Sequence, residues 1–136
     1  MAWYTEILKK KGIKVPRQNK YKNVKVEYDG YSFPSKGHAH CYSILKLQEK
    51  AGEIQVLQVE DNVRLSEAKI LYIADFKCLD LETNKEFWVE FKGFETPQWR
   101  IKLRLWESYG PGDLHIYKAT YRNGIISVYL DKIIKR

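Results

Sequence analysis

A strand-like segment near the middle of the chain carries two ionisable residues on one face. Residues 87–93 are rich in aromatic and β-branched types, which favour strands, and side chains alternate between the two faces of a strand. Glu90 and Lys92 therefore share a face, roughly 7 Å apart by the usual rise per residue. A carboxylate in this place could bind a divalent metal, and the ammonium could orient a water beside it. This pair is the first candidate for a chemical site.

A second carboxylate lies on the preceding predicted strand, residues 70–79. Asp75 and Lys77 interrupt what is otherwise an apolar row on one face of that strand. The polar segment 82–85 predicts a turn between the two strands, which then pair in antiparallel fashion. This pairing is expected to bring Asp75 beside Glu90 and Lys92.

The composition bounds the class of protein. With 136 residues, 44% hydrophobic and 14% aromatic, the chain is expected to pack a single core. Its 24 Lys and Arg exceed its 17 Asp and Glu and give a net charge of +7, which favours polyanionic partners, nucleic acid before membrane. Cys41 and Cys78 are too isolated for a zinc ribbon or a disulfide framework, so we expect buried, reduced thiols.

The N-terminal sequence has apolar residues followed by a lysine run, which reverses the order found in secretion signals. No apolar run approaches the length of a membrane span. We therefore expect a cytoplasmic protein with no membrane partner.

The elements around the candidate site predict an α/β fold with a mixed central β-sheet and flanking helices. Residues 1–23 are expected to form an N-terminal helix and a basic arm, and residues 24–136 a single domain. The expected elements of that domain are a hairpin at 24–33, a helix at 36–50 after Ser35 and before Gly52, strands at 54–59, 70–79 and 87–93, a helix at 97–108 after Thr96, a strand at 114–117, and a hairpin turn at Asn123-Gly124.

The second predicted helix has a buried and a basic side. Trp99, Leu103 and Trp106 form its apolar stripe, which is expected to belong to the core. The cations Arg100, Lys102 and Arg104 fall elsewhere around the helix, close in sequence to Glu90 and Lys92. This surface is a candidate for phosphate contacts.

Several segments, taken in order, carry a resemblance to a known superfamily. They are Tyr28-Asp29-Gly30, Ser35-Lys36, Lys50-Ala51-Gly52-Glu53-Ile54, Tyr72-Ile73-Ala74-Asp75-Phe76 and Glu90-Phe91-Lys92-Gly93-Phe94. With the order helix, three strands, helix, strand, the chain resembles the PD-(D/E)xK nuclease superfamily. The run from Lys20 to Tyr109 looks like small phage-encoded nucleases related to archaeal-type Holliday junction resolvases.

The resemblance implies a restriction-endonuclease-like core and a defined catalytic site. Asp75 and Glu90 would bind Mg²⁺ or Mn²⁺, hard cations that prefer oxygen ligands. Lys92 would orient the attacking water or support the charge of the transition state. The implied activity is metal-dependent, structure-selective hydrolysis of DNA.

The implied partner is branched DNA, such as a four-way junction. Resolution of a junction requires two symmetry-related cuts, so a homodimer is expected. DNA contacts are assigned to the cations Lys20, Lys22, Lys36, Arg100, Lys102 and Arg104. If the protein is phage-encoded, its location would be the cytoplasm of the host cell.

The chain departs from the superfamily pattern near the first helix of the core, where related proteins usually carry a glutamate and this chain has His38. His38 could bind metal or phosphate, or Glu60 could supply the further ligand. His38 could also mark weakened or altered catalysis, or it could form a surface pair with His40 near the start of the helix.

Two other functions fit the same residues. A nuclease of this fold could act on linear or nicked DNA, and a non-catalytic nucleic-acid-binding module would also explain the positive charge. In the plainest structural reading, Glu90 and Lys92 are solvated residues and Asp75 is a cross-strand partner of Lys92.

Overall fold

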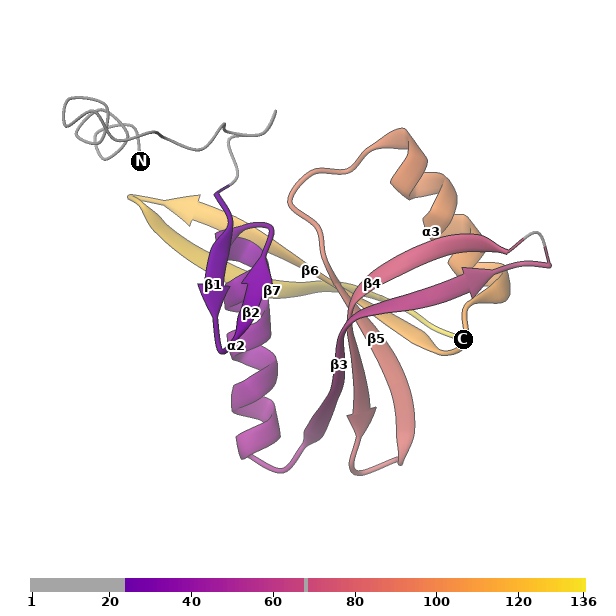
Figure 1. The fold of residues 1–136 in the computed structure, drawn as a ribbon, viewed down its shortest axis with the longest axis horizontal. Helices are drawn as coiled ribbons and strands as arrows, with labels where there is room; N and C mark the ends of the chain where they lie inside the picture. Colours follow the sequence, from indigo (N-terminus) through magenta and orange to yellow (C-terminus); the bar gives the residue numbers. More distant parts are fainter. Residues whose placement is uncertain (1–23, 68) are drawn as a thin grey trace. The chain divides into compact units, whose positions relative to one another are not determined.

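The computed structural model describes residues 24–67 and 69–136 (Figure 1). These residues form two helices and seven strands: β1 (Val26–Tyr28), β2 (Tyr31–Phe33), α2 (Lys36–Lys50), β3 (Ile54–Leu65), β4 (Ile70–Asp80), β5 (Lys85–Phe91), α3 (Pro97–Tyr109), β6 (Asp113–Arg122) and β7 (Ile125–Ile134). Contacts divide the chain into two units, Met1–Lys36 and Gly37–Arg136. The boundary predicted after residue 23 stays a prediction, and the helix and arm predicted before it lie outside the described residues.

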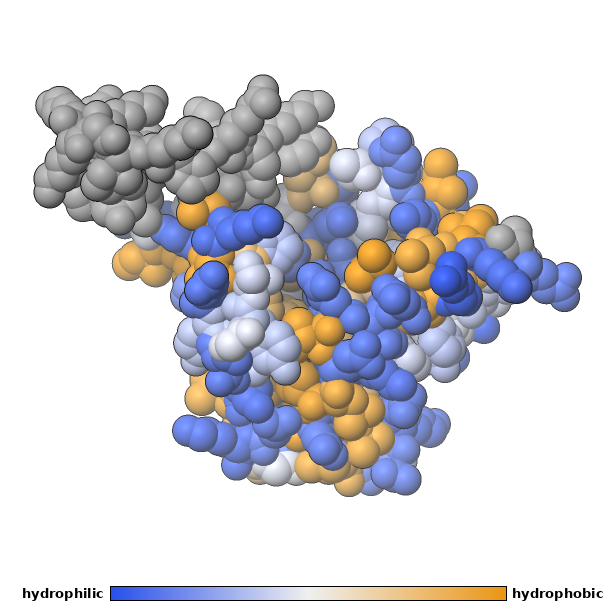
Figure 2. All heavy atoms as spheres, in the orientation of Figure 1, coloured by the Kyte–Doolittle hydropathy of each residue, from blue (hydrophilic) through white to orange (hydrophobic). Residues whose placement is uncertain are grey.

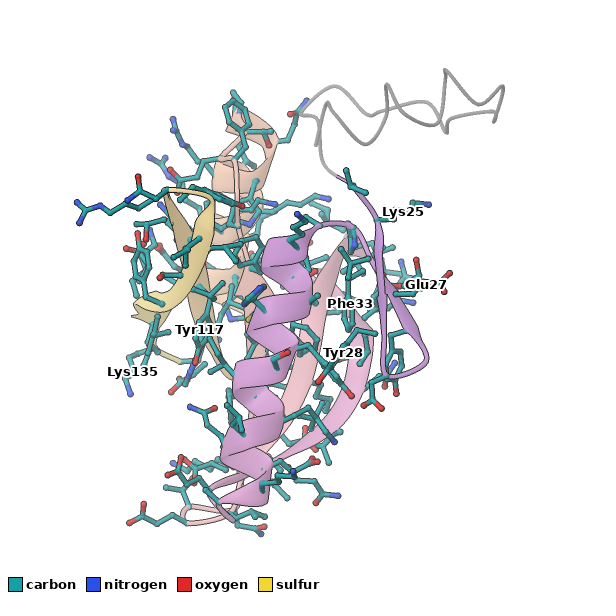
Figure 3. All side chains as sticks on the ribbon, turned by 90° about the vertical axis from the view of Figure 1, so that its left-hand side faces the viewer. Lys25, Glu27, Tyr28, Phe33, Tyr117 and Lys135 are labelled. Carbon is teal, nitrogen blue, oxygen red and sulfur yellow. The ribbon has the colours of Figure 1, made fainter. Side chains whose placement is uncertain are left out.

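The first unit contains the predicted hairpin. Strands β1 and β2 pair in antiparallel register, with Tyr28 opposite Tyr31. The connecting residues Asp29 and Gly30 have φ angles of 53° and 81°, the left-handed conformation that tight hairpin turns require. Phe33 is buried whereas Tyr28 is exposed, and both are labelled in Figure 3. The hairpin expected at 24–33 is therefore confirmed.

The second unit is built on a five-stranded mixed sheet in the order β3-β4-β5-β6-β7. Strands β3, β4 and β5 form an antiparallel meander, whereas β6 runs parallel to β5 and antiparallel to β7. A parallel pair needs a crossover connection, which here contains α3. The predicted α/β class with a mixed sheet and flanking helices is confirmed at this level.

Helix α2 packs on one face of the sheet. Its Tyr42 ring stacks on Phe76 of β4 with the centroids 5.9 Å apart. Figure 3 shows the helix lying along the sheet, with Tyr117 of β6 to one side of it. The helix ends where expected, because Gly52 adopts a φ of 78° and accommodates the left-handed turn after the last helical residues.

Helix α3 packs on the other face. The Thr96 hydroxyl oxygen accepts a hydrogen bond from the Trp99 backbone N–H at 3.1 Å, and Pro97 starts the helix, as predicted. Trp99, Leu103 and Trp106 are buried in one cluster with residues of β3, β4, β5 and β6. The Trp106 ring meets Trp88 of β5 edge to face, with the centroids 5.7 Å apart.

Three strands differ in length from the prediction. β3 continues to Leu65, so the polar residues 60–62 lie inside it rather than after it. Glu60 takes a φ of 58°, and the ladder to β4 resumes beyond it. β6 begins at Asp113 and extends to Arg122. It is longer than predicted because β7 pairs with it from Leu114 to Arg122. β5 ends at Phe91, and Lys92 lies immediately after it.

Neither described helix is long and apolar enough to cross a bilayer.

Candidate functional site

The site lies where β4 and β5 separate. Their backbone pairing runs from Asp80 opposite Lys85 to Phe76 opposite Val89 and stops there, whereas β4 remains paired with β3 as far as Ile70. At the end of the shared ladder, the Phe91 N–H donates a hydrogen bond of 2.7 Å to Oδ2 of the Asp75 side chain. The Asp75 carboxylate is therefore held between the two strands at the point where they separate.

Glu90 and Lys92 lie at the same end of β5. Lys92 Nζ is 3.4 Å from Oε1 of Glu90 and 5.1 Å from the centroid of the Trp99 ring. The Lys92 backbone N–H donates to the Tyr117 carbonyl at 2.9 Å, which holds the segment against β6. Glu90 is only 6% exposed, and its Oε2 has no hydrogen-bond partner within the described part of the chain. A buried carboxylate oxygen without a partner is costly and needs an explanation.

Burial shifts the pKa of both carboxyl groups of the site upward. Burial raises the pKa of Asp75 well above its usual range, and the negative charge of Glu90 raises it further. Burial also raises the pKa of Glu90 to about 7, although the positive charge of Lys92 opposes this shift. One lysine thus serves two carboxyl groups, one buried and one partly buried, and an added cation would stabilise their ionised forms.

His38 joins this site from the first turn of α2. Its Nε2 lies 3.5 Å from Asp75 Oδ2, and its ring meets Phe91 edge to face with the centroids 4.9 Å apart. Burial and the charge of Lys92 lower the pKa of His38 to about 4, so the imidazole is neutral at neutral pH. Because its side chain is only 18% exposed, His38 does not form a surface pair with the exposed His40.

Glu60 lies opposite Asp75 in the β3–β4 register. The flanking pairs are Val59 with Phe76 and Asp61 with Ala74, so Glu60 falls at the intervening position. Glu60 is exposed, and its negative charge contributes to the raised pKa of Asp75. No group of three or more His, Cys, Asp or Glu side chains among the described residues is arranged to hold a metal by itself. The roles of His38 and Glu60 as further ligands stay predictions.

The structure brings one of the predicted DNA-binding cations to the site. Lys102 lines a cavity of about 390 Å³ together with Glu90 and Lys92. Arg104 is exposed on α3, and Arg100 lies 3.8 Å from a carboxylate oxygen of Glu95. Lys36 is exposed in the first unit, whereas Lys20 and Lys22 lie outside the described residues.

Two residues that sequence reasoning did not single out also shape the site. A Cβ atom at Gly37 would lie 2.0 Å from Cζ of Phe91, so only glycine permits this approach of α2 to β5. The Tyr72 hydroxyl accepts a hydrogen bond from Trp99 Nε1 at 3.1 Å and lies in the wall of the cavity that Glu90 lines. The available signal for Gly37 was a glycine in the first turn of a helix, directly before His38.

The fold and site define a mixed α/β domain with one buried carboxylate, one partly buried carboxylate and an adjacent lysine. Residues 18–124 match the family described as "Protein of unknown function (DUF1064)". The chain belongs to this family. No curated protein matches the chain, and no solved structure matches it either.

Proposed function

We propose that this protein is a metal-dependent DNA endonuclease with a restriction-endonuclease-like core, acting on Holliday junctions or other branched DNA. The observation that carries the proposal is the placement of the partly buried Asp75 and the buried Glu90 at the point where β4 and β5 separate, with Lys92 beside Glu90. Perturbed carboxylates next to a fixed cation are typical of catalytic sites.

The arrangement of secondary structure supports the core. α2 precedes the antiparallel meander β3-β4-β5, and α3 then leads to the parallel strand β6. Asp75 falls on the second strand of the meander, Glu90 falls at the end of the third, and Lys92 lies directly after that strand. This is the element order and residue placement that the resemblance to PD-(D/E)xK nucleases implies.

The donor set fits a divalent cation. Asp75 and Glu90 supply carboxylate oxygens, the ligands that Mg²⁺ and Mn²⁺ prefer, and Glu90 Oε2 accepts no hydrogen bond within 3.5 Å from the described residues. The raised pKa values of both carboxyl groups indicate a site that ionises fully only when positive charge is added. Mg²⁺ with its waters needs few protein ligands, so two carboxylates suffice. When bound, the metal would supply an activated water and stabilise charge on the scissile phosphate.

The residues of the chain have distinct parts in this proposal. The Phe91 N–H fixes the Asp75 carboxylate, while Lys92 faces Glu90 and would hold the attacking water or a phosphate oxygen by its ammonium group. His38 offers a neutral imidazole next to Asp75 and would orient that carboxylate or add a nitrogen ligand. Lys102 would contact a phosphate near the cut.

A homodimer belongs to the proposal because resolution of a junction needs two active sites related by symmetry. The apolar edge strand β7 is one candidate surface, since its Ile125, Tyr129 and Leu130 are exposed. The apolar N-terminal residues are the other candidate, and they lie outside the described part of the chain.

The deciding experiment uses an end-labelled four-way junction and a linear duplex of matched sequence, each with Mg²⁺, Mn²⁺ or EDTA. We expect cleavage of the junction with metal and none with EDTA. Asp75→Asn should reduce the cleavage rate by at least about a hundredfold, because the metal loses a charged ligand. It should leave junction binding in EDTA unchanged. The control is Asp80→Asn, the same chemical change on the same strand, opposite Lys85 at the other end of the β4–β5 ladder.

The outcomes separate the alternatives. Equal cleavage of both substrates would favour a nuclease for linear or nicked DNA. Absence of metal-dependent cleavage of any DNA, with binding retained, would favour a non-catalytic binding module. Parallel loss of binding and cleavage in Asp75→Asn would count against the assigned role of Asp75.

A further inference from the structure

A cavity of about 390 Å³ opens beside the candidate catalytic residues, between the first part of β4 and the start of α3. Glu90 and Lys92 form the wall that it shares with the site, and Leu71, Ile73, Gln98 and Lys102 are among its other lining residues. Its volume falls in the range of about 300–1,000 Å³ typical of small-ligand pockets. A ligand in this cavity would therefore lie directly beside the proposed reacting phosphate.

One wall of the cavity is apolar and faces solvent. Ile73 is 54% exposed, and Leu71 from the same strand lines the cavity with it. Figure 2 shows hydrophobic side chains interrupting the hydrophilic surface over the outer ends of β3 and β4. An exposed apolar wall within a concave site is suited to a flat, weakly polar group such as a nucleobase.

The opposite wall is polar and positively charged. Lys102 is only partly exposed and makes no ion pair with the described residues, in contrast to Arg100 on the same helix, which lies beside Glu95. Gln98 adds an amide, which can both donate and accept hydrogen bonds. This wall is suited to a phosphate and to the polar edge of a base.

We propose that the cavity binds one unpaired nucleotide of the DNA strand, adjacent to the phosphate that is cleaved. The base lies against Leu71 and Ile73, and a flanking phosphate lies near Lys102. The inference rests on the proposed nuclease function and gives it a physical basis for substrate selection. A base stacked inside a continuous duplex cannot enter a pocket, so the cavity selects DNA in which a strand leaves the duplex, as at a branch.

The test measures base unstacking without cleavage. In EDTA, the protein is bound to four-way junctions that carry 2-aminopurine at single positions within three nucleotides of the branch, and to a matched linear duplex. A 2-aminopurine that leaves the base stack gains fluorescence. We expect a rise of at least about threefold at one junction position and no rise in the linear duplex.

Matched variants connect the signal with the cavity. Ile73→Ser should remove most of the fluorescence rise and weaken junction binding by about five- to tenfold, the loss that follows when an apolar side chain no longer covers a base. Ile101→Ser is the control, because Ile101 is an exposed isoleucine, 61% accessible, that does not line the cavity. Lys102→Gln should weaken binding of the junction, and Lys50→Gln, at an exposed lysine at the end of α2, provides its control.

The results distinguish this inference from the nuclease proposal. Metal-dependent junction cleavage without any fluorescence rise, and with Ile73→Ser equal to Ile101→Ser, would overturn the nucleotide site while leaving the nuclease standing. A fluorescence rise that Ile73→Ser abolishes, in a protein that cleaves no DNA, would support the site and overturn the nuclease. Equal loss of junction and duplex binding in Lys102→Gln, with Ile73→Ser unaffected, would indicate phosphate contact alone and overturn the inference.

Discussion

The backbone N–H of Phe91 donates its hydrogen bond to the side chain of Asp75 rather than to a backbone carbonyl of β4. A longer β4–β5 ladder would pair this N–H with the neighbouring strand, but the shared ladder stops at Phe76 and Val89. The Asp75 carboxylate accepts this hydrogen bond where a backbone carbonyl of β4 would otherwise accept it. Its position is thereby fixed by the backbone of the strand that carries Glu90, and the negative charge of Glu90 raises the pKa of Asp75.

The raised pKa of Glu90 predicts a pH-dependent stability in the absence of metal. In the folded protein the pKa of Glu90 is about 7, compared with an ordinary glutamate pKa near 4.5. The contribution of Glu90 to the free energy of unfolding is therefore highest below pH 4.5 and falls as the pH rises to about 7, by at most about 1.4 kcal/mol per pH unit. Urea unfolding of the wild type and Glu90→Gln in EDTA, from pH 4 to 8, measures this effect.

The comparison with Glu90→Gln isolates this group because the variant retains the shape of the side chain but does not titrate. The wild type should lose stability relative to the variant as the pH rises, and Mn²⁺ or Mg²⁺ should recover it above pH 7. A difference that stays constant across the range would show that Glu90 ionises as an ordinary exposed carboxyl group.

His38 should titrate far below a solvent-exposed histidine. Burial, aided by the charge of Lys92, lowers its pKa to about 4. Because the unfolded chain takes up this proton near pH 6.5, the contribution of His38 to stability is lost as the pH falls from 6.5 towards 4, opposite in sign to that of Glu90. NMR titration of the imidazole resonances, with His38 assigned by its absence in His38→Gln, gives the midpoint directly. A midpoint at or above 6.5 would refute the buried placement.

Gly37→Ala should destabilise the protein even though alanine is the better helix former. Helix propensity alone favours the change by about 1 kcal/mol, but the new Cβ would lie 2.0 Å from the buried ring of Phe91. Overpacking of this kind costs about 1–3 kcal/mol, so we expect a net loss in the free energy of unfolding. Chemical denaturation of both proteins provides the measurement.

Gly93→Ala is the matched control for Gly37→Ala, because the nearest atom to its added Cβ is 3.8 Å away. We expect a change within about 0.5 kcal/mol. Replacing Phe91 by leucine in the Gly37→Ala background should recover part of the lost stability. If Gly37→Ala proves as stable as Gly93→Ala, the close approach of α2 to β5 is not present in solution.

Both thiols should be unreactive in the folded protein. Cys41 and Cys78 are fully buried and free, and burial raises the pKa of Cys78 to about 12. The thiolate is the reactive form, so Ellman's reagent at pH 8 should modify neither cysteine within an hour and both within minutes in guanidinium. Rapid modification of one thiol in the native protein would show that α2 or β4 opens readily.

Local sequence signals predicted much of the fold because the features concerned depend on neighbouring residues. Thr96 and Pro97 predicted the start of α3 through the capping hydrogen bond that the structure contains, and Asn123-Gly124 predicted the β6–β7 turn. β3 is longer than its local sequence predicts. A polar stretch normally ends a strand, but here pairing with β4 continues beyond Glu60.

The sequence by itself determined the residue types of the candidate site and the strands that carry them, because strand alternation places Glu90 and Lys92 on one face. Only the tertiary structure decided how these residues meet. The end of the β4–β5 ladder sets the place of Asp75, and the contact of Gly37 with Phe91 sets that of His38. The shifted pKa values follow from burial, which depends on how distant elements pack and is not encoded in any local pattern.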